Sequence, residues 1–492
     1  MEAPAPRARA HVAPVGAASL PQVRPRTRGL RFRLRALGIG PALRLAALAA
    51  VLGVSHLAGA LGDRLRPAAR RAGRREARQA RAAARVVRSL GRLRGAWVKL
   101  GQFAALRYDV LPEPWRAGLA SLQDRVEPQP FERIRARVEL ELGAPLETLF
   151  SEFDPVPLGT ASLAQAHRAR LPGGEEVAVK VQHPGLEEAL PGDLALLRRL
   201  TAAWARRGRG RLDAQRLVEE FAAGLREELD FEREARVAAE LAANLAFEPG
   251  IVVPAVVASH STRRVLTMEY RPAVRIDDRA ALIRLGVAPR AVLEILARGY
   301  AKQIFVDGLF HADPHPGNLF VLDEPQAASR PRVLFVDFGL SRRLAPELRR
   351  ELRRGLLAVL QGDVPAFLAG MDRMGMVAPG GHAAVEAAVR AMFERLRGEG
   401  APLGLAGERV LALKDEAKRL LQETEGLQLP NDLLLYAKTL SYLLALGSRL
   451  DPELDLMRLA LPYLLRFLAE PEDAAAGLRP AGAEPGAGPA GG

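Results

Sequence analysis

Two spacings of apolar residues divide the chain into helical and strand-like segments. From about Leu61 to Arg107, and again from Phe131 to Leu142, apolar side chains recur every three or four positions, which predicts amphipathic helices. The stretches Leu163 to Ala169 and Glu176 to Gln182 are strand-like and flank a Pro-Gly-Gly sequence at 172–174. This order of strand, turn and strand predicts a β-hairpin.

The rest of the chain is mostly helical in pattern. Residues 187–246 predict helices, while Ile251 to Ser259 and Arg264 to Glu269 predict two strands. From Ala291 to about Leu468 the pattern is helical again, apart from a segment at 308–340. Strands that precede a long run of helices predict an α+β fold with two lobes and a cleft between them.

Five parts are expected along the sequence. The order is a disordered basic arm, a helical N-terminal extension, a small β-containing lobe, a helical lobe and a disordered Ala/Gly/Pro-rich tail. Their predicted limits are 1–36, 37–145, 146–270, 271–471 and 472–492.

Basic charge is concentrated at the N-terminal end. The net charge is +14, and residues 1–100 hold 22 Lys and Arg against three acidic residues. This asymmetry indicates either contact with an anionic surface or an arginine-rich disordered arm. Few aromatic residues lie between the arginines, so anionic phospholipid is favoured over nucleic acid as the partner. The absence of cysteine excludes disulfides and thiolate metal sites, and fits a cytoplasmic protein.

One uncharged stretch, from Leu45 to Gly62, follows the basic arm. Its length permits a membrane span, but its residues are mostly small or weakly apolar. Peripheral contact with the inner face of a membrane is therefore favoured over a span, and burial against the rest of the protein is an equal alternative.

The sequence His-Ala-Asp-Pro-His-Pro-Gly-Asn at 311–318 is the most informative motif. Asp337-Phe-Gly follows it, after two strand-like stretches that predict a hairpin. Phosphotransferases with a protein-kinase-like fold need this combination of residues. Asp313 would orient the attacking hydroxyl or water, while Asn318 and Asp337 would hold Mg²⁺ on ATP.

Lys180 ends a predicted strand and is the candidate ligand of the α- and β-phosphates. Lysine is scarce in this arginine-rich chain, which suggests that arginine cannot serve at the positions where it occurs. The six lysines are at 99, 180, 302, 414, 418 and 438. A phosphate-binding lysine needs a carboxylate to hold it. The stretch Glu227 to Glu234 supplies candidates on one predicted helix, with Asp230 and Glu234 on the same face.

A loop at 157–165 stands where protein kinases have three glycines, and it retains one. Such a loop is expected to be stiff and to close poorly on a γ-phosphate. Its expected contacts with phosphate are Gly159, Thr160, Ala161 and Ser162. The strand that ends at Tyr270 would place the backbone of Glu269 and Arg271 beside adenine.

Over about residues 85–345 these features together resemble the UbiB/AarF family of atypical kinases. Lys99-Leu-Gly-Gln102 is similar to the KxGQ motif of that family, residues 159–162 to its alanine-rich loop, and Glu228-Leu-Asp230 to its ExD motif. Glu234 then matches the lysine-pairing glutamate. The resemblance implies that Lys99 and Gln102 fold over the cleft, near Glu228 and Asp230, and block a protein substrate.

The resemblance also implies a function. It predicts binding of ATP or ADP with Mg²⁺, ATPase-like or small-molecule chemistry, and a role in isoprenoid-quinone biosynthesis or membrane-lipid homeostasis. Two positions depart from the pattern. Gly159-Thr160 replaces two typical alanines, which leaves the choice between ATP and ADP open, and Ala312 stands where glycine is common.

Three alternatives remain at this stage. A phosphotransferase of the aminoglycoside/choline kinase type would lack the KxGQ and ExD motifs. A nucleotide-binding pseudokinase scaffold would keep the site without turnover. A metalloenzyme would use His311, Asp313, His315 and Asp337 as ligands. In the favoured hypothesis His311 supports the Asp-Phe-Gly turn, and His315 contacts phosphate.

Overall fold

A computed structural model describes residues 39–64, 71–107, 113–123, 127–206, 214–398 and 426–470, with the single residues 111, 420 and 424. The predicted basic arm and the predicted C-terminal tail lie outside the described residues. The residue limits of the five predicted parts stay predictions.

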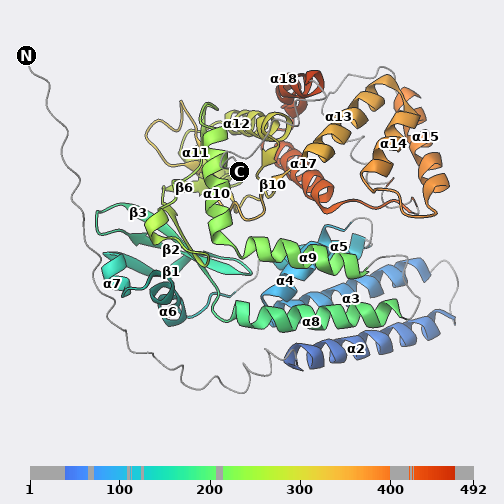
Figure 1. Ribbon diagram of the computed structural model, residues 1–492, viewed down its shortest axis with the longest axis horizontal. Coiled ribbons are helices and arrows are strands. Elements are labelled where there is room, and N and C mark those ends of the chain that lie inside the picture. Colours follow the sequence, from blue (N-terminus) through green and yellow to red (C-terminus); the bar gives the residue numbers. More distant parts are fainter. Residues whose placement is uncertain are drawn as a thin grey trace, which may run out of the picture.

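The small lobe is built on a four-stranded antiparallel sheet (Figure 1). Its strands lie in the order β1 (Glu152–Thr160), β2 (Ala164–Arg170), β3 (Glu176–Gln182) and β5 (Val265–Glu269). The β2–β3 pairing confirms the hairpin predicted around residues 172–174. Helix α6 (Phe131–Leu142) and the short α7 (Leu146–Leu149) cover one face of the sheet. They bury apolar side chains there, which include Ile134, Val138, Phe150, Val179 and Val181.

A layer of helices from two distant parts of the sequence packs beside this sheet (Figure 1). The N-terminal part contributes α2 (Ile39–Arg64), α3 (Arg71–Leu93), α4 (Ala96–Ala105) and α5 (Glu113–Ala120). The segment after β3 contributes α8 (Leu186–Ala205) and α9 (Ala214–Glu228). The two groups share one apolar core, which includes Trp97, Leu119, Leu197, Phe221 and Leu225. This shared core fixes α4 against the rest of the molecule.

Helix α10 (Phe231–Asn244) links the sheet to the larger, mainly helical lobe. The helices of that lobe are α11 (Arg279–Arg284), α12 (Pro289–Ala301), the π-helical turn η4 (Lys302–Asp307), α13 (Pro346–Gln361), α14 (Val364–Arg373), α15 (His382–Gly398), α17 (Asn431–Leu450) and α18 (Leu456–Ala469). Its core includes Tyr300, Phe310, Phe335 and Phe338. The two lobes and the helical extension confirm the predicted α+β, protein-kinase-like architecture.

Short strands in the larger lobe carry the catalytic motifs. A four-stranded sheet has the order β4 (Ile251–Val252), β9 (Val333–Phe335), β8 (Leu319–Leu322) and β6 (Ala273–Arg275). A second sheet pairs β10 (Arg342–Arg343) with β7 (Leu309–Phe310). The β8–β9 pairing is antiparallel and confirms the hairpin predicted between Asn318 and Asp337.

Three local predictions were wrong. Most of the predicted loop 157–165 is strand, since β1 extends to Thr160, β2 begins at Ala164, and only Ala161 to Leu163 lie between them. The strand predicted at 251–259 is only two residues long and runs parallel to β9. Pro254 follows it and has no N–H for a ladder. The helix predicted through Glu227 to Glu234 breaks at Leu229 and Asp230.

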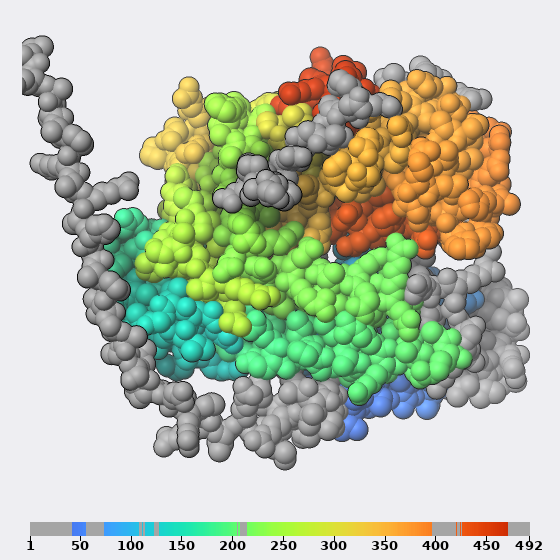
Figure 2. Space-filling model, viewed as in Figure 1, coloured from blue at the N-terminus to red at the C-terminus, as the bar shows by residue number. Residues whose placement is uncertain are grey.

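Helix α2 contains the whole uncharged stretch from Leu45 to Gly62. It packs against α3, and part of it forms the blue patch at the lower edge of the view in Figure 2. Leu43, Val51 and Val54 are exposed on it. Arg44 on α2 donates a hydrogen bond to the carbonyl of Arg92. Among the residues that the structure describes, no helix has both the length and the apolar content needed to cross a membrane.

Candidate active site

A pocket of about 620 Å³ lies between the lobes and gathers most of the predicted site residues. The small lobe supplies the β1–β2 turn and β3, the larger lobe supplies the catalytic segment, and α4, α9 and α17 close the remaining side. The predicted residues that line it are Lys99, Gln102, Gly159, Thr160, Ala161, Ser162, Lys180, Glu228, Glu269, Arg271, Asp313, Asn318 and Asp337. Glu234 lies directly behind Lys180, and Asp230 is not part of the pocket wall.

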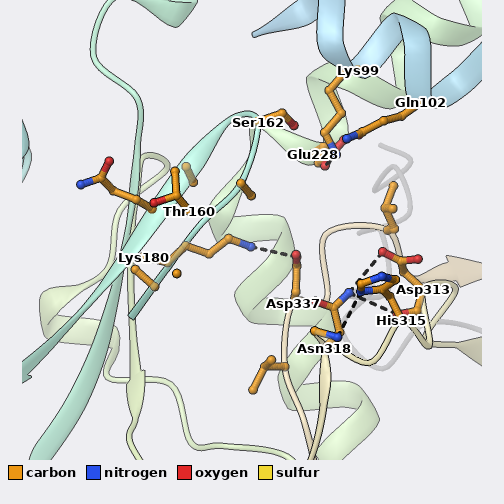
Figure 3. Close-up of a pocket in the computed structure, with 18 of the residues that line it drawn as sticks. Lys99, Gln102, Thr160, Ser162, Lys180, Glu228, Asp313, His315, Asn318 and Asp337 are labelled. Carbon is orange, nitrogen blue, oxygen red and sulfur yellow. Dashed lines mark hydrogen bonds and ion pairs between the residues drawn. The ribbon is translucent and has the colours of Figure 1, made fainter. Parts of the chain in front are cut away.

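Lys180 joins three elements at the centre of the pocket (Figure 3). Its ammonium group on β3 donates to both carboxylate oxygens of Glu234 on α10, at 2.8 and 2.9 Å. It also donates to Oδ1 of Asp337 at 2.9 Å. The Lys180–Glu234 pair predicted from the sequence is therefore present. Burial alone would lower the pKa of Lys180, but the carboxylates of Asp337 and Glu234 raise it well above its ordinary value.

The Asp-Phe-Gly turn is fixed by contacts on both sides. The backbone of Asp337 is left-handed, with φ of 63°, a conformation that is uncommon outside glycine. The N–H of Phe338 donates to Oε1 of Glu234, and Phe338 is fully buried. Burial would raise the pKa of Asp337, yet the Lys180 ammonium holds this pKa well below its ordinary value. The Asp337 carboxylate is therefore ionised and aimed at the pocket.

His311 contacts the backbone of the Asp-Phe-Gly turn, in the supporting role that the sequence predicted. Its Nε2 lies 2.9 Å from the carbonyl of Asp337 and 3.1 Å from that of Val336, so Nε2 carries the proton. The hydroxyl of Tyr300 then donates to Nδ1, at 3.1 Å. Burial lowers the pKa of His311, which keeps the ring neutral. Both ring nitrogens are engaged, and this leaves His311 without a lone pair for a metal.

Asp313 and Asn318 face each other across the turn of the catalytic segment (Figure 3). Nδ2 of Asn318 donates to Oδ2 of Asp313 and to the Asp313 carbonyl, both at 3.2 Å. Oδ1 of Asp313 accepts from Nζ of Lys438 at 2.7 Å. Burial would raise the pKa of Asp313, but the Lys438 ammonium outweighs this and lowers it. Asp313 is thus a fixed, ionised acceptor.

The oxygen donors around Asn318 and Asp337 suit a hard cation such as Mg²⁺. The amide nitrogen of Asn318 faces Asp313, and within the described chain no donor is found for its Oδ1 or for the second carboxylate oxygen of Asp337. These two oxygens are the ones that could hold a metal ion. In the described residues no group of three or more His, Cys, Asp or Glu side chains could hold a metal by itself.

Helix α4 closes the pocket opposite Lys180. Lys99 forms an ion pair with Glu228 on α9, and Gln102 points the same way while its amide donates to the carbonyl of Leu122 (Figure 3). Gly101 lets α4 approach α3 and the 3₁₀ turn Ser121–Gln123 that follows α5. A Cβ at Gly101 would overlap Leu122 in that turn and lie 3.1 Å from Leu90 on α3. Lys99 and Gln102 therefore lie near Glu228, as the resemblance predicted.

Asp230 caps a helix, a role that the sequence did not predict. Its carboxylate accepts the backbone N–H of Arg233 at 2.9 Å and caps the first turn of α10. This cap starts the helix that carries Glu234, so Asp230 contributes to the pocket by placing that helix.

The other end of the pocket is suited to a flat apolar ring. Ala178, Met268 and Leu334 line it, beside the strand that leads from β5 to Arg271. The N–H of Glu269 is already bonded to the carbonyl of Ala255 at 2.8 Å. Glu269 would therefore accept a hydrogen bond from adenine at its carbonyl oxygen.

Sequence reasoning missed Lys438, which belongs to α17 and lines the pocket next to Asp313. The scarcity of lysine was a signal that could have found it. Of the four lysines in the part of the chain that the structure describes, only Lys302 is not a pocket residue.

This geometry defines a protein-kinase-like fold with a paired lysine, a catalytic segment and an Asp-Phe-Gly turn. The chain belongs to the ABC1 atypical kinase-like family, whose domain model matches residues 121–369. A probable protein kinase UbiB of Marinobacter nauticus is 35% identical over 381 residues, which make up 76% of this chain and 68% of that protein. The membership confirms the resemblance found in the motifs.

Two further similarities agree. The chloroplastic protein ACTIVITY OF BC1 COMPLEX KINASE 8 of Arabidopsis thaliana is 33% identical over 407 residues, 77% of this chain and 53% of that protein. The structure of the Rv3197–erythromycin complex from Mycobacterium tuberculosis has a TM-score of 0.51 and 25% identity. It covers 78% of this chain and 95% of the other.

Lys180→Met is expected to destabilise the protein strongly, because it leaves the buried carboxylate of Glu234 without its cation. The free energy of unfolding in urea should fall by about 3–5 kcal/mol. Adding Glu234→Gln in the same chain should recover part of that loss, since the amide carries no charge.

The matched control is Arg198→Met, which breaks the exposed ion pair with Glu219. It should cost no more than about 1 kcal/mol. A Lys180→Met variant as stable as this control would contradict the account of Lys180.

Proposed function

We propose that this protein is an atypical kinase or ATPase that binds Mg-ATP or Mg-ADP in the pocket between its lobes. One observation supports this most strongly: the Lys180 ammonium bridges Glu234 and Asp337. That bridge joins the candidate phosphate ligand of the small lobe to the candidate metal ligand of the larger lobe. Protein-kinase-like phosphotransferases need both groups in place at once.

Each residue has a specific part in this proposal. Lys180 binds the α- and β-phosphates as a compact charge while Glu234 holds it. Asn318 and Asp337 hold Mg²⁺, which would neutralise charge that develops on the phosphates. Asp313 accepts a hydrogen bond from the attacking water or hydroxyl and orients it towards the γ-phosphate. The backbone of residues 159–162, at the end of β1 and in the turn after it, approaches the phosphates, and the backbone of Glu269 and Arg271 approaches adenine.

The acceptor of the phosphoryl group is proposed to be water or a small molecule rather than a protein. Helix α4 covers the side of the pocket that faces Glu228, and Lys99 holds it there. Only residues 340–345 separate the Asp-Phe-Gly turn from α13, which leaves little chain for a peptide-docking segment. In this proposal the KxGQ segment regulates access to the cleft.

An apolar compartment beside α4 supports a lipid-like or quinone-related acceptor. This part of the pocket is lined by Phe103 on α4 and Leu106 just after it, by Phe221 and Leu225 on α9, and by Leu435 on α17. Together with the UbiB relatives, this compartment favours a role in isoprenoid-quinone biosynthesis, with membrane-lipid homeostasis as the second possibility.

Cells whose only copy of this protein carries Asp313→Asn should lose isoprenoid quinone. An unchanged quinone content would contradict the role in quinone biosynthesis.

The surface between α2 and α3 is proposed to contact anionic phospholipid at the inner face of a membrane. A groove there is lined by five arginines together with Leu48 and Val51, and Arg88 and Arg92 are exposed. The arginines are Arg44, Arg85, Arg88, Arg92 and Arg94. Basic and apolar groups in one groove suit a lipid headgroup and its acyl chain.

Purified protein should hydrolyse ATP in the presence of Mg²⁺. Asp313→Asn should lower kcat by about 10²-fold or more, since it removes the acceptor for the attacking hydroxyl. Lys302→Met, which breaks a lysine–aspartate pair outside the pocket, is the matched control and should keep the wild-type rate. Tight binding of nucleotide without turnover would favour the pseudokinase scaffold instead.

Reversing two charges in the groove, with Arg88→Glu and Arg92→Glu, should weaken binding to vesicles that contain phosphatidylglycerol. Each arginine near an anionic surface contributes about 1 kcal/mol, so the loss should be about tenfold or more at low salt. The matched control reverses two exposed arginines of the larger lobe, Arg449 and Arg458. Equal vesicle binding by both variants would contradict this surface assignment.

A further inference from the structure

Lys438 on α17 is a buried cation at the catalytic aspartate. Its Nζ lies 2.7 Å from Oδ1 of Asp313, the residue is 6% exposed, and the two positions are 125 residues apart in the sequence. The ammonium also lies 5.6 Å from the centre of the Tyr442 ring, one helical turn further along α17. The neighbouring Thr439 donates its hydroxyl to the carbonyl of Ala312 at 3.2 Å. Helix α17 is thus anchored directly on the catalytic segment.

Each carboxylate oxygen of Asp313 accepts a hydrogen bond from a different residue. Oδ1 accepts from Lys438, and Oδ2 accepts from Nδ2 of Asn318 at 3.2 Å. These two donors approach from different elements, so they determine the rotation of the carboxylate about its Cβ–Cγ bond. Asp313 also lines the pocket, so its carboxylate is within reach of an acceptor hydroxyl bound there.

His315 does not take this place beside Asp313. Its Nδ1 accepts the N–H of Gly317 at 3.1 Å, and its ring lies edge-on to Tyr442 with 6.0 Å between ring centres. Among the described residues, the ammonium group that pairs with Asp313 therefore comes from α17 and not from the catalytic segment itself.

We propose that Lys438 is a positioning residue for Asp313, which holds this carboxylate in the orientation that directs the attacking water or hydroxyl. This inference rests on the function proposed above. A buried ion pair is expensive to desolvate, and its good geometry here is what offsets the cost. Lysine suits the position because its ammonium is a compact charge, whereas a guanidinium would need room for a planar fork.

The competing explanation is that the pair only fastens α17 to the larger lobe. Lys302 provides the comparison, since its Nζ lies 2.7 Å from Oδ1 of Asp307 in a pair that is also mostly buried. Lys302 is not a pocket residue. If Lys438 only fastened α17 to the larger lobe, loss of Lys438 and loss of Lys302 should both lower stability, and neither should change kcat.

The test compares Lys438→Met, Lys438→Arg and Lys302→Met in the full chain, with kcat and KM measured for Mg-ATP. Lys438→Met should lower kcat about 10- to 100-fold, while KM changes little, because the interaction matters for the reacting group and not for nucleotide binding. Lys438→Arg should recover part of kcat, since it keeps a cation at the position. Lys302→Met should match the wild type in both constants.

A double-mutant cycle then tests whether Lys438 acts through Asp313. In the Asp313→Asn background, adding Lys438→Met should lower the residual rate less than about twofold, because the group that it positions is gone. The inference would be overturned if Lys438→Met lowered the rate by the same factor in the wild-type and Asp313→Asn backgrounds. It would also be overturned if Lys438→Met had a wild-type kcat or changed KM alone. If Lys438→Met does not fold, Lys438→Arg decides: a wild-type kcat with an altered side chain at this tight position would overturn the role. Absence of turnover in the wild type would overturn the proposed function and this role with it.

Discussion

The ion pairs of Lys180 are the interaction on which the site depends. Lys180 belongs to β3 of the small lobe, Glu234 to α10 and Asp337 to the turn after β9 of the larger lobe. The side chain of Glu234 is 1% exposed, so an unpaired charge there would be very costly. The lobes must therefore meet in the arrangement that brings the ammonium to both carboxylates. The left-handed backbone of Asp337 and the contact from His311 hold the other half of this arrangement.

Pairing of opposite charges from different elements also occurs in the rest of the pocket. Each of three lysines is matched to carboxylates from another element: Lys99 to Glu228, Lys180 to Glu234 and Asp337, and Lys438 to Asp313. The lysines come from the N-terminal extension, the small lobe and helix α17. Segments that are far apart in the sequence thus meet at one polar centre, while separate apolar cores hold each of them in place.

Local motifs made much of this site predictable. The spacing of Asp313 and Asn318, the hairpin that leads to Asp337, and the pairing of Lys180 with Glu234 follow from short segments whose chemistry is recognisable in sequence. The role of Asp230 was not predictable in this way, because an ExD sequence does not reveal that the helix breaks and uses its aspartate as a cap. The extent of β1 depends on its pairing with β2, which outweighs the turn-forming residues Pro157 and Gly159. Lys438 was missed because its partner lies 125 residues away and only tertiary packing joins them.

The most direct test of the central claim is nucleotide binding by the wild-type protein, measured by calorimetry with ATP and with ADP, each with Mg²⁺ and with the metal chelated. The account predicts saturable binding that weakens at least tenfold when Mg²⁺ is removed, and an Asp337→Asn variant in which this dependence on Mg²⁺ is lost. Binding of equal affinity with and without Mg²⁺, or no binding at all, would contradict the account of this pocket.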